Sequence, residues 1–141
     1  MKRIIVLGLF LMLSASVLAT ASGGSARADD SVNVFWRKFK AAVISGNKAA
    51  VASMSRFPVE MSYGIAPIRN RAQMLRRYRE VFSQQADAVQ CFSRKQPEMD
   101  AQDAKRFVVA CPDSAGNEVV IYQFQRTRLG WKFVGLDNIN E

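Results

Sequence analysis

Histidine is absent from the 141-residue chain. Its absence removes the most common general base and metal ligand, and with it every Ser-His or Cys-His nucleophilic pair. The fingerprints of phosphate-binding loops, dinucleotide sites and acyl-transfer serines are missing as well. The carboxylates Glu98, Asp100 and Asp103 lack the glycine and terminal glutamate of a calcium loop, so a solvated loop is the better interpretation. The sequence therefore indicates no cofactor, no metal site and no assignable catalytic residue.

Only one long apolar run occurs, and it stands at the N-terminus. The basic start Met1-Lys2-Arg3 precedes it, and Ser25-Ala26-Arg27-Ala28 ends in an A-x-A pattern. This order predicts a secretory signal peptide, residues 1–28, cleaved after Ala28, and a periplasmic or secreted protein. The alternative is an uncleaved membrane anchor over residues 4–21, which approaches the ~20 apolar residues of a bilayer span.

Removal of 28 residues from 141 leaves 113, enough for one domain, residues 29–141. Because the leader holds three basic residues and no acid, 17 basic and 12 acidic residues remain, a net charge of +5. A basic exported protein suits anionic lipids, glycans or proteins, and export makes nucleic acid the least expected of its partners.

Cysteine is scarce, with only Cys91 and Cys111 present. An even count in an exported chain predicts one disulfide. If residues 89–95 and 106–111 are neighbouring antiparallel strands, pairing the cysteines centres a hairpin on Ala101, inside a polar, proline-containing segment. Directly opposed Cβ atoms then lie ~4.5–5.5 Å apart, and a modest shift allows the bond.

Helical spacing dominates the first half of the mature chain. A first helix is expected to begin at a cap formed by Asp30 or Ser31 and to break at Ser45-Gly46-Asn47, where a second, short helix starts. Asn70 is expected to cap a third helix. The first helix buries one apolar face, made of Val32, Phe35, Trp36, Phe39, Ala42 and Val43.

Strand patterns fill most of the rest. A short edge strand is predicted around Phe57, Val59 and Met61, where the neighbouring proline disfavours a central position. Four β-rich segments follow, separated by polar turns. They span residues 88–95, 105–111, 118–127 and 131–136. Helices first and an antiparallel meander after them predict an α+β domain.

This order resembles the nuclear-transport-factor-2-like (NTF2-like), cystatin-like superfamily. The resemblance rests on the helix break at Ser45-Gly46-Asn47, the lead from Gly64 into Asn70-Arg71-Ala72, and the closing segment Leu129 to Asp137. It implies a cone-shaped roll in which N-terminal helices close over a curved antiparallel sheet, and it is most similar to exported bacterial members of unknown function. Such folds host isomerases, dehydratases, ligand binders and dimerisation modules, so the fold selects none of these activities.

An interior pocket is one hypothesis that the resemblance raises. Its walls would be aromatic, with Asp137 as the acid least easily dismissed and Gln123 or Arg126 at the mouth. The competing interpretation, which the helical and strand spacing favours, is an ordinary core. The pocket residues are Trp36, Tyr63, Tyr78, Tyr122, Trp131 and Asp137.

The third helix raises a second hypothesis. Met74, Leu75, Tyr78, Val81 and Phe82 gather in one arc and predict a core-packed helix, with arginines on the opposite side and Glu80 among them. A solvated outer face is the favoured interpretation, and docking on an anionic envelope surface is the alternative. The arginines concerned are Arg69, Arg76, Arg77 and Arg79.

These patterns favour an exported, non-catalytic module that binds a protein partner or a small apolar ligand. An isomerase or lyase working in the cone is the alternative, although the acids Glu60, Glu80, Asp87 and Asp113 fall at strand ends, turns or outer helix faces. A homodimer formed through the open sheet face is a further expectation, with contacts from Val119, Ile121 and Val134.

Overall fold

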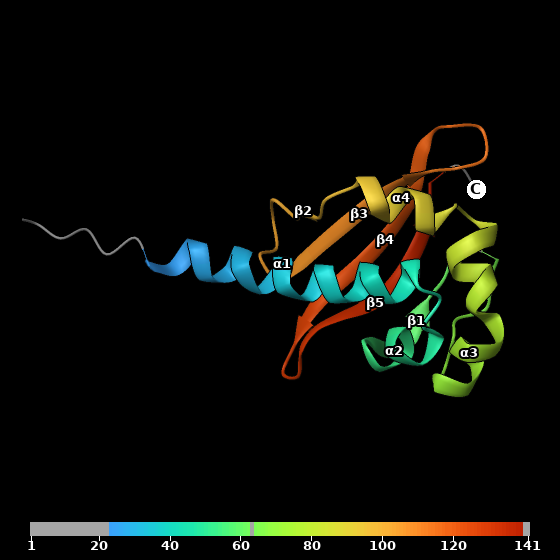
Figure 1. The fold of residues 1–141 in the computed structure, drawn as a ribbon, viewed down its shortest axis with the longest axis horizontal. Helices are drawn as coiled ribbons and strands as arrows, with labels where there is room; N and C mark the ends of the chain where they lie inside the picture. Colours follow the sequence, from blue (N-terminus) through green and yellow to red (C-terminus); the bar gives the residue numbers. More distant parts are fainter. Residues whose placement is uncertain (1–22, 63, 140–141) are drawn as a thin grey trace, which may run out of the picture.

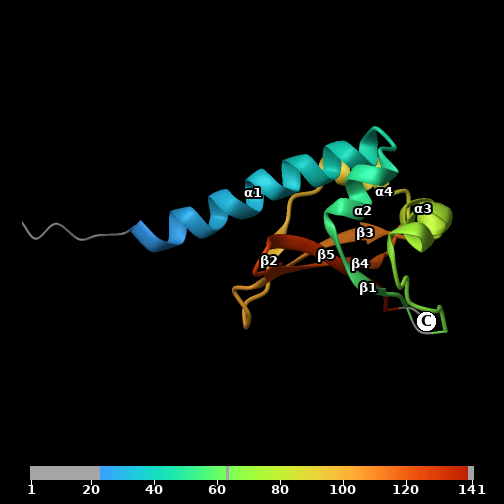
Figure 2. The same ribbon diagram turned by 90° about the horizontal axis from the view of Figure 1, so that it is seen from below.

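The computed structural model describes residues 23–62 and 64–139, and for residues 23–30 the backbone alone. Helices α1, α2 and α4 lie over one face of a five-stranded sheet, and α3 stands at one end of it (Figure 1, Figure 2). The elements are α1 Gly23–Ile44, α2 Lys48–Ser53, β1 Ser55–Glu60, α3 Arg71–Arg79, the π-helical turn η1 Glu80–Gln84, α4 Ala88–Arg94, β2 Glu98–Met99, β3 Arg106–Pro112, β4 Glu118–Thr127 and β5 Gly130–Asn138.

The sheet has the strand order β1-β5-β4-β3-β2. Strands β3, β4 and β5 match three of the four strands predicted for the antiparallel meander, and β1 is the predicted edge strand. The short strand β2, which pairs with β3, falls in a segment predicted as a loop. The expectation of a purely antiparallel sheet is wrong at the β1 edge, because β1 pairs with β5 in parallel. Along β4, Tyr122 and Phe124 point under the helices while Ile121 and Gln123 occupy the open face, since strand side chains alternate.

The helix caps agree with the sequence in two places. The Asn47 side chain accepts a hydrogen bond from the Ala50 N–H at 3.0 Å, and the Asn70 side chain accepts one from the Gln73 N–H at 3.0 Å. The predicted start of the first helix at Asp30 or Ser31 is wrong, because α1 begins at Gly23. Within residues 23–62 and 64–139, no helix is long and apolar enough to span a membrane.

Residues 88–95 were predicted as a strand, and the structure corrects this to the helix α4. The Asp87 carboxylate accepts a hydrogen bond from the Gln90 N–H at 3.0 Å, as an N-cap does. Ala88, Cys91 and Phe92 are buried at the i, i+3, i+4 spacing of a helical face, while Val89 is exposed.

The Cys91–Cys111 disulfide is present, as predicted, with a Cα–Cα distance of 5.7 Å. The hairpin centred on Ala101 is wrong, since the bond joins α4 to β3. The disulfide therefore ties the helical layer to the sheet rather than one strand to the next.

Aromatic rings fill the space between the helices and the sheet. The Phe39 ring meets the Phe124 ring edge-on at 5.0 Å between centroids, and the Phe107 and Phe124 rings stack at 4.5 Å. Phe82 stacks on Tyr122 at 5.8 Å. Fully buried aromatic side chains on α1, η1 and the strands thus form one continuous core.

Candidate functional site

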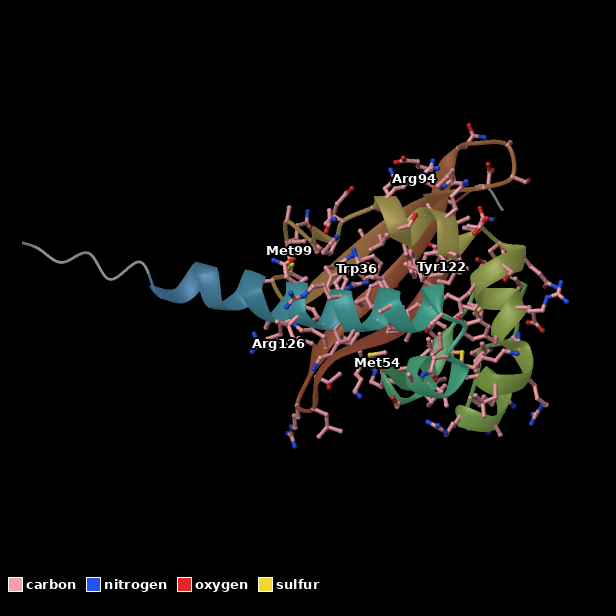
Figure 3. All side chains as sticks on the ribbon, in the orientation of Figure 1. Trp36, Met54, Arg94, Met99, Tyr122 and Arg126 are labelled. Carbon is pink, nitrogen blue, oxygen red and sulfur yellow. A yellow bond between two sulfur atoms is a disulfide. The ribbon has the colours of Figure 1, made fainter. Side chains whose placement is uncertain are left out.

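The aromatic residues proposed as pocket walls lie in this core. Trp36 and Tyr122 are fully buried, and Tyr78 and Trp131 are nearly so. The Phe92 ring separates Trp36 from Tyr122, with a centroid distance of 4.9 Å to each. Figure 3 labels both residues, Trp36 on α1 and Tyr122 on β4. The competing interpretation as packing describes these side chains better, and Tyr63 lies outside the described residues.

Tyr122 is sealed and already hydrogen-bonded. Its hydroxyl donates to the Val81 carbonyl oxygen at 2.8 Å. Burial raises the pKa of Tyr122, and the nearby Tyr78 and Asp87 raise that pKa further. Burial also raises the pKa of Tyr78. A hydroxyl held neutral and committed to a backbone carbonyl is a structural donor, because it has no free geometry in which to donate to a substrate.

No carboxylate accompanies these rings inside the described part of the chain. The buried polar side chains there are Ser55 and Ser62 alone. Asp137 is exposed on the open sheet face, since it pairs with Ile121 in the register of β4 and β5. Gln123 lies on the same open face, and Arg126 is exposed near the β4–β5 hairpin (Figure 3).

A hollow does exist between α1 and the β4–β5 hairpin, and we call it the α1–hairpin groove. It has a volume of about 510 Å³ and lies beside Met54, on the side of α1 that faces the hairpin (Figure 3). The Trp131 Nε1–H donates to the Ser31 hydroxyl at 3.2 Å, which holds the hairpin to α1. The groove is lined by Ser31, Val34, Phe35, Lys38, Met54, Leu129, Gly130, Trp131 and Lys132.

The chemistry of this groove is apolar with positive edges. Leu129 is 86% exposed at the hairpin turn, and Val34 is 36% exposed on α1. Among the residues whose side chains the structure describes, its charged lining residues are Lys38 and Lys132. The Lys132 ammonium donates to the Ser53 carbonyl oxygen at 2.8 Å, so it is positioned at the rim. The sequence prediction missed the groove, although an exposed leucine in a turn was the available signal.

A second hollow of about 480 Å³ lies against the disulfide, between η1, α4 and the β3–β4 turn. Both signs of charge line it, from Asp87 and Asp113 to Arg94 and Lys95. Asp87 caps α4, and Asp113 accepts turn N–H groups from Ala115 and Asn117. Its polar groups therefore serve local structure, and the hollow has no single ligand chemistry.

The arginines of the third helix divide into two groups. Arg69, Arg76 and Arg79 are exposed, as expected. Arg77 is half-buried, because its guanidinium pairs with Glu80 at 2.7 Å and donates to the Pro67 carbonyl oxygen at 3.4 Å. Arg71, which the prediction left out, is exposed at the start of α3.

The residues proposed for dimer contacts also divide. Ile121 and Val134 are half-buried on the open sheet face, and Val119 is buried. Since two of the three occupy the expected face, the homodimer stays a prediction.

No protein-family model matches the chain, and no curated protein matches it in sequence. Several solved structures are similar in fold. An NTF2-like protein with a cystatin-like fold from Novosphingobium aromaticivorans is 15% identical, with 80% of this chain and 81% of that chain covered and a TM-score of 0.43. A ketosteroid isomerase-like protein from Erwinia carotovora atroseptica is 12% identical, with 77% and 92% covered and a TM-score of 0.46.

A hexachlorocyclohexane dehydrochlorinase is 11% identical, with 79% of this chain and 84% of that chain covered and a TM-score of 0.46. By its element order and sheet the chain has the α+β fold that the sequence predicted. Matches at this identity concern the fold alone, and they carry no conclusion about ligand or activity.

Proposed function

We propose that this protein is an exported, non-catalytic binding module whose ligand is an apolar chain with an anionic head, held in the α1–hairpin groove. The observation that carries the proposal is the groove itself. Among the described side chains it combines an apolar lining with two lysines as its charged residues, and it lies outside the aromatic core.

The size and lining of the groove support a small ligand. Its volume falls inside the ~300–1,000 Å³ range of ligand sites, which are mostly apolar with a few placed polar groups. Phe35, Met54 and Trp131 offer apolar surface to a hydrocarbon chain. Lys38 and Lys132 favour a carboxylate at the rim, because a nearby cation stabilises an anion in a partly desolvated site.

The described residues do not provide the buried carboxylic acid that the isomerase or lyase alternative requires. Acid–base chemistry in a cone needs a carboxylic acid in an apolar setting and a free hydroxyl donor. In the described chain the Tyr122 hydroxyl is bonded to Val81, and the buried Tyr78 hydroxyl has no hydrogen-bond partner. The interior described here holds no carboxylate to act beside either hydroxyl. These observations favour binding without turnover.

Export is part of the same proposal. Residues 1–22 lie outside the described part of the chain, and Gly23–Ala28 form the first turns of α1. Cleavage after Ala28 would leave α1 to begin at Asp29. We expect the protein recovered from the cell envelope to have an intact mass that begins at Asp29. A full-length mass in the membrane fraction would instead identify the anchor alternative.

Ligand binding is tested by calorimetry with dodecanoate and with the uncharged dodecanol as probes. Val34→Asp places a carboxylate in the groove, and Val89→Asp is its matched control because Val89 is a similarly exposed valine on α4, away from the groove. We expect Val34→Asp to weaken dodecanoate binding by on the order of tenfold or more, since apolar contact is lost and repulsion gained. Val89→Asp should bind as the wild type does.

Three results would count against the proposal in different ways. Equal weakening by both variants would remove the groove as the site. Equal affinity for dodecanol and dodecanoate would show that the lysines do not contribute to binding and that only the apolar chain is recognised. Absence of binding by either probe to folded wild-type protein would refute a chain-like ligand altogether.

A further inference from the structure

We propose that a second surface, the exposed side of α3, docks the protein on a bilayer that contains anionic phospholipid. We call this surface the arginine face and define it as Arg69, Arg71, Arg76 and Arg79 around Leu75. It is independent of the α1–hairpin groove, because none of these residues lines that groove.

The arginine face is held rigidly by the buried side of the same helix. Met74 and Tyr78 are buried, and Asn70 caps the helix. On a helix Leu75 lies between Arg71 and Arg79, four residues away on either side, so an apolar side chain is flanked by two cations. Leu75 is 36% exposed. The packed and capped helix thus fixes the backbone positions from which these side chains project.

The charge of this face is uncompensated. Within residues 23–62 and 64–139, none of its four arginines forms an ion pair. The one acid on this helical segment that forms an ion pair, Glu80, is bound to Arg77, which is turned toward Pro67 and is not part of the face. Three of these guanidinium groups lie on the nine-residue helix α3 and the fourth, Arg69, precedes its N-cap, and none has an ion-pair partner among the described residues. Such a cluster makes a site for phosphate, which arginine binds in a bidentate manner.

The shape of the arginine face favours a bilayer over a small ligand or a protruding side chain of a partner protein. The hollows against the disulfide, in the α1–hairpin groove, on the open sheet face and beside Trp36 are all lined by other elements. The arginine face therefore offers a helix surface with one projecting leucine. Such a surface matches a headgroup layer, where arginines meet phosphates and Leu75 enters the acyl boundary.

The position of α3 leaves the groove free during docking. Figures 1 and 2 show α3 at one end of the sheet and the turn of the β4–β5 hairpin at the other end of the sheet. A protein held to a membrane through α3 would expose the α1–hairpin groove on its far side. Both surfaces can then be occupied at once.

Vesicle co-sedimentation of the full mature protein tests the proposal, with phosphatidylcholine vesicles that either contain or lack phosphatidylglycerol, at low and high salt. The test variant is Arg71→Gln, Arg76→Gln and Arg79→Gln together. The charge-matched control is Arg94→Gln, Arg126→Gln and Arg128→Gln together, three exposed arginines elsewhere. Circular dichroism establishes that both variants are folded before binding is compared.

We expect wild-type protein to partition onto the anionic vesicles at low salt, and partitioning to fall as salt screens the charges. The α3 variant should lose on the order of 100-fold in partitioning, and the control far less, since only cations close to the surface contribute fully. Leu75→Gln should weaken partitioning without changing its salt dependence. Equal losses for the two triple variants would overturn the proposal, as would equal partitioning onto vesicles without phosphatidylglycerol. Absence of wild-type partitioning would refute it directly.

Discussion

Reduction of the Cys91–Cys111 bond should destabilise the protein by about 3 kcal/mol. The cysteines are 20 residues apart, and closing a loop of that length removes roughly this much free energy from the unfolded state at 25 °C on the chain-entropy model. For a domain of this size, such a loss corresponds to a melting temperature lower by on the order of 12 °C. The effect should appear in the free energy of unfolding, because the core contacts of both side chains survive in the thiol form.

Urea unfolding followed by circular dichroism measures this loss. Wild-type protein is reduced in denaturant, refolded under reductant and compared with the oxidised form. Cys91→Ala with Cys111→Ala serves as the control, since its unfolding should not respond to reductant. The double alanine variant should be less stable than oxidised wild type by more than the loop-closure free energy, because both cysteines are buried and the smaller alanine side chains leave cavities. A loss under ~1 kcal/mol on reduction would refute the loop-closure reasoning.

Three further predictions concern single side chains. Asn70→Ala removes the cap of α3 and should cost about 1 kcal/mol in urea unfolding; an unchanged midpoint would show that the cap is dispensable. Tyr122→Phe removes the buried hydrogen bond to the Val81 carbonyl and should cost on the order of 1–2 kcal/mol, and no change in stability would show that this bond contributes nothing. Burial raises the pKa of Tyr122 above its unfolded value, so the stability this group contributes is complete below pH ~10 and is lost as the pH rises above it. Urea midpoints at neutral and strongly alkaline pH should show that fall, and Tyr122→Phe should flatten it.

The strands that pair with their sequence neighbours could be predicted from the sequence. Residues 118–127 were expected as a strand, and β4 has those bounds, because apolar alternation and the flanking turns are local signals. The parallel pairing of β1 with β5 was missed, since nothing in residues 55–60 shows which distant strand they will join.

The assignment of residues 88–95 failed for a different reason. A stretch that contains Val89, Cys91 and Phe92 has the composition of a strand, and this composition predicts a strand. The spacing of Ala88, Cys91 and Phe92 together with the cap at Asp87 satisfied a helix as well. The position of Val89 on the solvent side shows that helical spacing was the stronger signal.

The core could be predicted from the inward spacing of apolar residues, but that spacing says little about the two proposed binding surfaces. Trp36, Tyr78, Tyr122 and Trp131 follow the inward spacing of their elements, so the interpretation as core packing needed no knowledge of tertiary structure. The α1–hairpin groove joins Val34 to Leu129, two residues that lie off those inward faces and meet only after folding. Arg77 was predicted as part of the exposed arginine surface, but it is not, because its guanidinium pairs with Glu80. Arg71 belongs to that surface instead, and the sequence pattern does not show which arginine Glu80 will pair with.

Packed aromatic side chains fill the space between the helices and the sheet, and this bears on where the proposed ligands would bind. In the described residues the aromatic core holds no buried acid, the Tyr122 hydroxyl is bonded to Val81, and the Tyr78 hydroxyl has no hydrogen-bond partner. Both proposed binding surfaces therefore lie on the outside of the fold. The two outer surfaces depend on different forces. Binding as proposed for the α1–hairpin groove would rest mainly on apolar burial with two lysines, whereas docking as proposed for the arginine face would rest on four arginines without an ion pair in the described residues. Because salt screens exposed charges and leaves apolar burial intact, raising the salt concentration should release vesicles while dodecanoate stays bound. Loss of both together would mean that the two activities share one surface, which the separation of α3 from the hairpin opposes.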